Sequence, residues 1–216
     1  MGAPCSAPNG WSHADLFPWG SPRNAPEPSH WQHDILRADG TPFNAREAQF
    51  IKVMMGKSPA SAMPRRISLV PTAEKSPVPW RYTLEQPAGD WFQPDFNDTA
   101  WKPGAAPFGT EAPAIARKPN TVWTSADLWL RREFELPPGQ FTDLALLLHY
   151  DEDATVYING VLAVKAAGYN AAYKSFDITP EAEATLKPGK NVMATHCHQT
   201  AGGQYLDVGL EGVKGE

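Results

Sequence analysis

The stretch "DEDATVYINGVLAVKAAGYNAAYKSFDITPEAEATLKPGKNVMATHCHQ", residues 151–199, decides the fold class. Residues 154–158 and 161–165 flank Asn159-Gly160, which is the strongest two-residue signal for a β-hairpin. Two more strand-like runs follow at 174–178 and 192–198. Short strands that are separated by turns, with no helical segment between them, predict an antiparallel β-sandwich.

The sequence on both sides of this stretch extends the same pattern. Residues 128–136 alternate between apolar and polar side chains, as a strand with one buried face does. Residues 144–150 form a nearly continuous apolar run, which is typical of a strand buried on both faces, and 205–210 complete the set. The predicted fold class is therefore all-β, with the sandwich spanning residues 80–216.

The chain before residue 80 has a different character. Residues 1–57 form an aromatic and proline-rich extension in which one helix, 45–55, is predicted between an N-cap at Asn44 and a left-handed glycine at Gly56. Five prolines lie in residues 58–79, and this composition predicts an extended linker.

Composition excludes several classes of protein. With 42% hydrophobic and 20% charged residues among 216, the chain can bury a sizeable core. Its net charge of −5 argues against a nucleic-acid partner, because such partners are held by a concentrated basic face. No apolar run approaches the ~18 residues of a membrane span. The first ten residues show no signal peptide, and two cysteines imply no disulfide framework.

Two segments of the sandwich resemble a known family. The stretch "WFQPDFNDTAWKPGAAPFG", residues 91–109, is similar to the opening of galactose-binding-like jelly-roll domains. Residues 151–199 carry the pattern V-y-[VL]-N-G, a Gly-Tyr loop, F-D-I-T and G-k-N-v of the same domains. Such jelly rolls are the sugar-binding domains of β-galactosidase and β-glucuronidase-type glycoside hydrolases. Upstream, residues 31–57 resemble the end of the catalytic region of large glycoside hydrolases.

These resemblances imply a function. The chain is expected to be a non-catalytic carbohydrate-binding module, appended to a polysaccharide-degrading glycoside hydrolase that is secreted or periplasmic. Its expected partners are a polysaccharide or oligosaccharide and the catalytic domain of the parent enzyme, with no nucleic acid and no membrane. Two alternatives stay open, namely a structural support domain without a ligand, and a small polysaccharide hydrolase or lyase. The hydrolase is disfavoured because no G-x-S-x-G or H-E-x-x-H motif is present.

A sugar-binding site needs an exposed aromatic ring beside a few hydrogen-bonding side chains, because sugars present both apolar C–H faces and hydroxyl groups. The predicted ligand-binding residues lie in loops or at strand ends. The candidate aromatic platforms are Trp123, Tyr169 and Tyr173, and the candidate polar partners are Asn170, Gln199 and Tyr205.

Two polar motifs have metal-like spacing. Asp151 and Asp153 flank Glu152 after a buried strand and are candidate ligands of a structural calcium ion, although a solvated acidic turn is the simpler interpretation. His196 and His198 lie two residues apart and are expected on one face of a strand, with Cys197 on the other. They are interpreted as hydrogen-bonded or ligand-facing histidines, and no other cofactor is expected.

Overall fold

The computed structural model describes residues 45–56, 65–110 and 118–215. The chain divides into two units, Met1–Pro64 and Arg65–Glu216. In the first unit, helix α1 (Ala45–Met54) confirms the predicted helix, and Gly56 beyond it has a φ of 68° as expected of a terminating glycine. The predicted N-cap Asn44 lies outside the described residues. Neither described helix has the length and apolar character that a membrane span requires.

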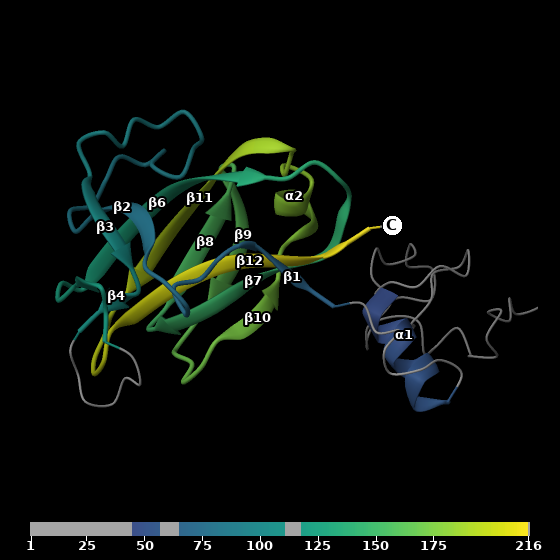
Figure 1. The fold of residues 1–216 in the computed structure, drawn as a ribbon. Helices are drawn as coiled ribbons and strands as arrows, with labels where there is room; N and C mark the ends of the chain where they lie inside the picture. The colour runs from purple at the N-terminus through teal and green to yellow at the C-terminus, as the bar shows by residue number, and fades with distance from the viewer. Residues whose placement is uncertain (1–44, 57–64, 111–117, 216) are drawn as a thin grey trace, which may run out of the picture. The chain divides into compact units, whose positions relative to one another are not determined.

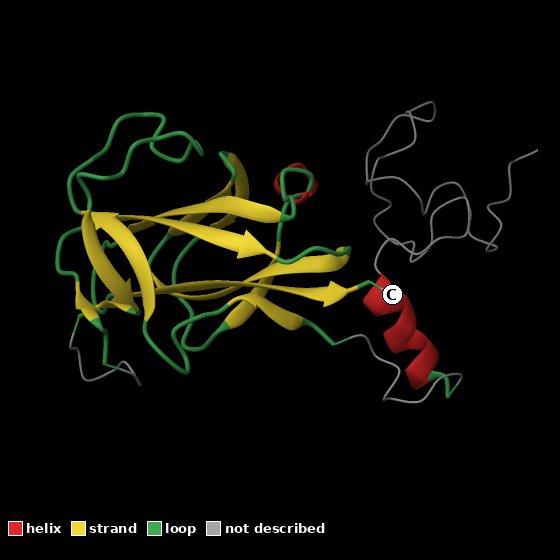
Figure 2. Ribbon diagram, turned by 45° about the horizontal axis from the view of Figure 1, so that its top comes forward, coloured by secondary structure: helices red, strands yellow, loops and turns green. Residues whose placement is uncertain are grey.

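The second unit is a sandwich of two sheets, which confirms the predicted all-β class (Figure 1). One sheet has the order β10-β7-β12-β4-β5, with β1 also paired to β12. The other has the order β3-β2-β6-β11-β8-β9. All pairs are antiparallel except β4 with β5, and Figure 2 shows the two sheets as separate layers.

The bounds of the strands follow in chain order. They are β1 (Ile67–Val70), β2 (Val78–Thr83), β3 (Lys102–Ala106), β4 (Phe108–Gly109), β5 (Thr121–Val122), β6 (Asp127–Leu136), β7 (Phe141–Asp151), β8 (Ala154–Ile158), β9 (Val161–Ala166), β10 (Lys174–Asp177), β11 (Gly189–His198) and β12 (Tyr205–Lys214). A four-residue helix, α2 (Pro180–Glu183), connects β10 to β11.

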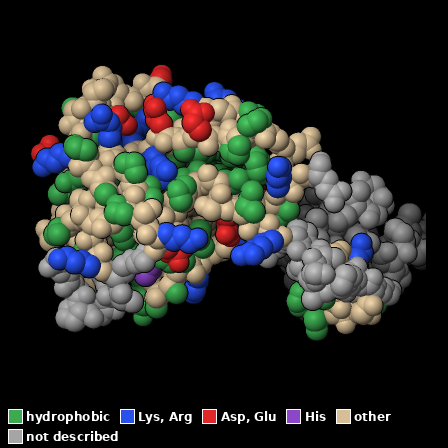
Figure 3. Space-filling view, in the orientation of Figure 1, with side chains coloured by type: hydrophobic (Ala, Val, Ile, Leu, Met, Phe, Trp, Pro, Cys, Tyr) green, Lys and Arg blue, Asp and Glu red, His purple; other side chains and the backbone are tan. Residues whose placement is uncertain are grey.

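The core lies between the sheets, where alternate side chains of the long strands meet. The predicted hairpin is present, with β8 and β9 joined by Asn159 and Gly160 at φ angles of 48° and 85°. Such positive angles match a right-handed strand twist and explain the Asn-Gly pair. On the face that Figure 3 shows, side chains of both charges are interspersed among hydrophobic ones.

Residues 84–101 cover the outer face of the β6–β11–β8 sheet. Their aromatic side chains pack on Trp129, Ala194 and Tyr157, which point away from the core, and Trp91 stacks on Trp101 with a centroid distance of 6.5 Å. Trp80 and Trp91 are both buried. The aromatic side chains of this loop and the sheet residues beneath them thus form a second, smaller hydrophobic cluster outside the core of the sandwich.

The segment expected to be a linker differs from that expectation where the structure describes it. Residues 67–70 form β1 and pair with 210–212 of β12. Arg66 anchors the approach to this strand, with ion pairs of 2.8 Å to Asp143 and 2.7 Å to Asp177. The sandwich unit therefore includes residues 65–79 in addition to the predicted 80–216, whereas residues 58–64 lie outside the described part.

The segment that contains Val70 and Thr72 lies so close to β12 that position 209 of this strand requires a glycine. A Cβ at Gly209 would lie 2.7 Å from the Val70 carbonyl oxygen and 2.8 Å from Thr72 Cγ2, so the covering segment would have to move. We expect Gly209→Ala to lower the free energy of unfolding by about 2 kcal/mol, measured by urea denaturation. Gly89→Ala is the matched control because nothing lies within 4 Å of its Cβ. Equal urea midpoints for Gly209→Ala and Gly89→Ala would contradict the close contact between Gly209 and the covering segment.

Candidate functional site

Two of the predicted ligand-binding residues are core residues. Trp123 has no exposed surface, and its indole Nε1 donates to Ser125 Oγ at 3.1 Å and to the Asp127 carbonyl at 3.2 Å. Tyr205 is 1% exposed. Neither ring presents a face to solvent, so the prediction that they contact a ligand is corrected. Each lies at a strand end; Trp123 packs in the core between the sheets, and the ring of Tyr205 packs against that of His149 at a centroid distance of 4.2 Å.

Asn170 holds a loop in place. Only 5% of the residue is exposed, its Oδ1 accepts a hydrogen bond from the Tyr150 amide at 3.0 Å, and its Nδ2 donates to the Leu148 carbonyl at 3.0 Å. The side chain therefore completes the edge of β7 in place of a strand partner. Its predicted role as a direct ligand contact is corrected to a positioning role.

Tyr173 belongs to a polar cluster on the outer face of the sheet that contains β12. Its hydroxyl donates to the buried carboxylate of Asp207, which also accepts from the Ala73 amide at 2.7 Å. Burial, followed by the negative charge of Asp207, raises the pKa of Tyr173, and burial likewise raises the pKa of Asp207. Because Asp207 joins the covering segment to the loop before β10, this cluster is a structural clamp.

Tyr169 is the exposed aromatic ring that the sequence predicted, with 71% of the residue exposed. The backbone on both sides is fixed, because the Gly168 amide donates to Asp153 Oδ1 at 2.6 Å and the Asn170 amide donates to the Tyr150 carbonyl at 3.0 Å. A further bridge pairs Tyr169 with Asp151. The loop thus presents the ring on an ordered backbone, which lowers the entropy cost of binding.

Gln199 lies directly after β11 at the same end of the sandwich. Its amide donates to the Ala126 carbonyl at 2.7 Å, and its side-chain Oε1 is buried with no hydrogen-bond partner in the described part of the chain. An unpartnered acceptor is costly when it is shielded from water.

The two histidines share one carboxylate. His196 Nε2 and His198 Nδ1 each lie 2.8 Å from Asp127 Oδ1, and His196 stacks on Trp129 at 4.8 Å and 13°. The expectation that both histidines lie on one face is confirmed, and Cys197 is buried on the other. Burial alone would raise the pKa of Asp127, but the hydrogen bonds from His198 and His196 outweigh it and lower the pKa.

The acidic turn 151–153 lies beside these histidines. The backbone carbonyl of Asp153 accepts a hydrogen bond from the His198 amide at 3.0 Å. The carboxylate of Glu152 accepts hydrogen bonds from the amide and the hydroxyl of Thr200. Burial, and then the charge of Glu152, raises the pKa of Asp151. Within the described ranges, no group of three His, Cys, Asp or Glu side chains is placed to hold a metal ion. The calcium site at Asp151 and Asp153 stays a prediction.

Strand order brings these groups to one end of a single sheet. The start of β6, the end of β11, the start of β8 and the end of β9 are neighbours, which places Asp127, His198, Asp153 and Gly168 in sequence along that end. At about 4.8 Å per strand, the row spans about 14 Å. We call it the loop-end site, made of Asp127, the turn 151–153, Tyr169, His196, His198 and Gln199.

Asp127 is the member of the site that sequence reasoning missed. It precedes an apolar strand and carries no motif of its own. Its partnership with the histidines follows from the register in which His198 lies opposite Asp127 and His196 lies opposite Trp129. The alternation along β6 and β11 was visible in the sequence, but their mutual register was not.

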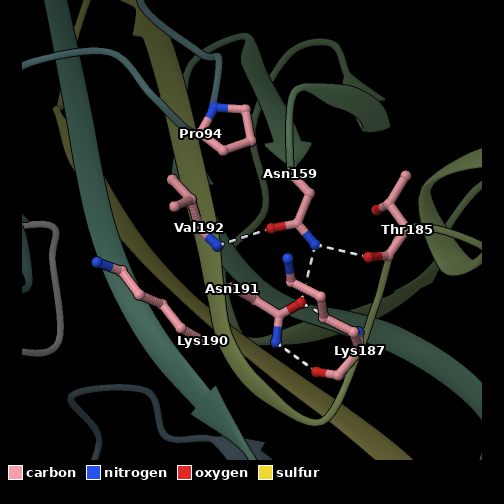
Figure 4. A pocket seen from close by; sticks show the side chains of 7 residues that line it. All are labelled: Pro94, Asn159, Thr185, Lys187, Lys190, Asn191 and Val192. Carbon is pink, nitrogen blue, oxygen red and sulfur yellow. Dashed lines mark hydrogen bonds between the residues drawn. The ribbon is translucent and has the colours of Figure 1, made fainter.

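A polar pocket of about 300 Å³ lies outside the loop-end site, lined in part by Asn159, Asn191 and Lys187 (Figure 4). Asn159 Nδ2 donates to Asn191 Oδ1 and to the Thr185 carbonyl, each at 2.8 Å. Asn191 Nδ2 donates to the carbonyls of Lys187 and Gly189 at 2.7 and 2.8 Å. All amide hydrogens of both side chains are therefore used within the protein, so these asparagines hold the turns together.

Comparison with known proteins places this geometry in context. No family model matches the chain. The sequence is 29% identical over 153 residues to an alpha-L-rhamnosidase of Streptomyces avermitilis, a match that covers 63% of this chain and 13% of that protein. A solved β-glucuronidase of Bacteroides uniformis is 24% identical, with a TM-score of 0.48, and the match covers 69% of this chain and 18% of that one.

A second solved structure, a β-glucuronidase from glycoside hydrolase family 2, is 18% identical, with a TM-score of 0.45. The match covers 68% of this chain and 17% of that one. The chain is similar to one part of much larger glycoside hydrolases. The match to the alpha-L-rhamnosidase agrees with the resemblance to a domain of glycoside hydrolases that the sequence indicated.

Proposed function

We propose that the sandwich unit is an accessory domain of a glycoside hydrolase and that it binds carbohydrate at the loop-end site. The observation that carries this proposal is Tyr169, whose ring is exposed although the backbone on each side is fixed by hydrogen bonds. An exposed ring on a hydrogen-bonded backbone offers an apolar face on which a partner can stack. The function is equilibrium binding, which raises the local concentration of substrate near a tethered catalytic domain.

The groups around Tyr169 suit a sugar. The ring supplies an apolar face for C–H groups, while the carboxylate of Asp127 and the half-exposed ring of His198 supply acceptors for hydroxyl groups. If both histidines donate to Asp127, the Nε2 of His198 keeps a lone pair for a ligand. An aromatic face beside a few directed polar groups is the usual composition of such sites.

Affinity electrophoresis of the full chain tests the proposal. The gel contains galactan, mannan, arabinan, β-glucan or a rhamnose-rich polysaccharide, each at several concentrations. We expect at least one polymer to retard the chain in a concentration-dependent way. A chain that no polymer retards would instead favour the structural support domain that the sequence left open.

Tyr169→Ala is expected to weaken the binding of the retarding polymer about tenfold, because a loss of about 1.4 kcal/mol in stacking corresponds to that factor. Tyr169→Phe is the matched control, since it keeps the ring and removes only the hydroxyl. The dissociation constants come from the slope of mobility against polymer concentration. Equal losses in the two variants would mean that stacking does not carry the interaction.

A further inference from the structure

One edge of the sheet that contains β6 is open along half of that strand. β2 pairs with β6 only through residues 81–83, which lie opposite 129–131. Beyond Arg131, β11 is the only strand paired with β6, so residues 132–136 have a partner on one side alone within the described part of the chain. Alternate residues of a strand direct their amide and carbonyl groups to opposite sides, so about half of this segment presents unpaired backbone groups.

A pocket of about 340 Å³ lies against this open edge. It is lined by residues 132–135 of β6 and by residues 69–71 at the end of β1, which belongs to the facing sheet. Side chains from both faces of β6 line it, and no residue of β11 does. The pocket therefore lies at the edge of β6 from which β2 has diverged, where an added strand would run about 4.8 Å away.

Arg132 brings a positive charge to this pocket that the protein pairs only weakly. Its guanidinium lies 5.9 Å from the centroid of the Trp80 ring, on the core side of β6. Within the described residues its one hydrogen bond, to the Pro71 carbonyl, is long at 3.4 Å, and no carboxylate forms an ion pair with it. Burial lowers the pKa of Arg132, against the charge of Asp207. A carboxylate that enters the pocket would pair with this guanidinium.

The outer face of the same segment carries the opposite charge. Glu133 and Glu135 are exposed and lie on either side of Phe134, which is buried. Glu133 forms an ion pair of 2.6 Å with Lys190, and Glu135 forms none in the described ranges. An added strand is complementary when its residue opposite Arg132 is acidic and its residues opposite Glu133 and Glu135 are basic.

A second copy of the chain does not have this order of charges. Two β6 edges that pair antiparallel about Phe134, the middle of the open segment, place Glu133 of each copy opposite Glu135 of the other. Like charges directly opposite each other destabilise a sheet. The charges at this edge therefore disfavour pairing between copies and favour a partner strand with the complementary order.

We propose that residues 132–136 are a docking edge for an extended peptide of a partner protein, which adds a strand to β6, places an acidic side chain on Arg132 and places basic side chains beside Glu133 and Glu135. In this mode of recognition the main-chain hydrogen bonds provide affinity, and the alternating side chains provide specificity. The docking edge is independent of the proposed carbohydrate binding, because it shares no residue with the loop-end site.

The probe is a fluorescein-labelled peptide, Thr-Val-Lys-Val-Lys-Glu-Thr, whose antiparallel register places its glutamate opposite Arg132. Fluorescence anisotropy with the full chain at low salt is expected to show saturable binding. The isomer Thr-Val-Glu-Val-Lys-Lys-Thr has the same composition and net charge but places a lysine opposite Arg132. We expect it to bind about tenfold more weakly.

Two N-methylated forms of the probe test the strand addition itself. Each form carries methyl groups on one of the two alternating sets of backbone amides, so only one form has lost the donors that face β6. We expect that form to lose binding and the other to keep it. This comparison uses the unaltered protein, so it does not depend on the folding of a variant.

Variants assign the charge preference to named residues. Arg132→Met removes the charge and is expected to reduce the preference between the isomers to about threefold or less, and Arg132→Lys to restore part of it. Glu135→Gln is expected to weaken binding of the probe about two- to threefold. Glu181→Gln is its matched control, because Glu181 is exposed on α2, and is expected to change nothing. Melting curves confirm that each variant is folded.

The outcomes decide the proposal. Equal binding of the two isomers overturns the charge order, and equal binding of the two N-methylated forms overturns strand addition. Absence of binding by every peptide overturns the docking edge and leaves its charges with the role of preventing pairing. Sedimentation of the full chain provides a further check, since dimers that form without peptide and are lost in Arg132→Met would assign the edge to a second copy instead.

Discussion

Replacing Asn191 by alanine is expected to lower the free energy of unfolding of the sandwich by about 4 kcal/mol, since each buried partner left without a hydrogen bond costs about 1–3 kcal/mol. The residue is 1% exposed. Its side chain donates to two backbone carbonyls and accepts from the Lys187 amide at 3.2 Å and from Asn159 Nδ2 at 2.8 Å. Alanine leaves all four partners without their bond to this side chain.

Urea denaturation of the sandwich unit, followed by tryptophan fluorescence, measures this change. Asn97→Ala is the matched control, because Asn97 is exposed and its Oδ1 only accepts local bonds from the Thr99 amide and hydroxyl. We expect that control to cost about 1 kcal/mol or less. A cost for Asn191→Ala that is no larger than this would mean that the asparagine network contributes little to stability.

Arg131→Met is the second large effect, with an expected loss of about 3 kcal/mol, as is typical when one partner of a buried ion pair is removed. Arg131 is 3% exposed, its Nε lies 3.0 Å from Asp98 Oδ2, and its guanidinium donates to the carbonyl of Trp91. It also lies over the ring of Phe96 at 5.3 Å. Methionine keeps most of the volume but leaves the carboxylate and the carbonyl unpaired.

Arg81 provides the control for this substitution. Its Nε lies 3.5 Å from the other oxygen of Asp98, but its side chain is 45% exposed, so water can replace it. We expect Arg81→Met to cost less than about 1 kcal/mol. Limited proteolysis gives a second readout, because loosening of residues 84–101 in Arg131→Met should expose that loop to cleavage. Equal stability of the two variants would show that Arg131 does not hold the loop on the sheet.

Local sequence signals predicted the strands with strong periodicity. The hairpin strands 154–158 and 161–165 were predicted within one residue, because Asn159-Gly160 fixes the turn between them. The start of β6 was likewise visible from alternation alone. The helix 45–55 followed from helical spacing and its terminating glycine.

The strands near prolines were missed for a physical reason. Proline removes a backbone donor, so a proline-rich segment is a poor candidate for the middle of a sheet. β3 avoids this cost as an edge strand, and β1 avoids it by lying between Pro64 and Pro71. In β2, Pro79 pairs only with β3, because β6 pairs with residues 81–83 alone. These arrangements depend on which strand lies next to which.

The sequence by itself determined the hairpin, the alternating strands and hence the β-sandwich, with Tyr169 in a loop. Only the tertiary structure decided which loop aromatics are buried, because Trp123 and Tyr169 both lie in turn-rich segments and differ in what packs above them. It also decided that Asp127 joins His196 and His198, since cross-strand register is set by the packing of whole strands and not by local residues.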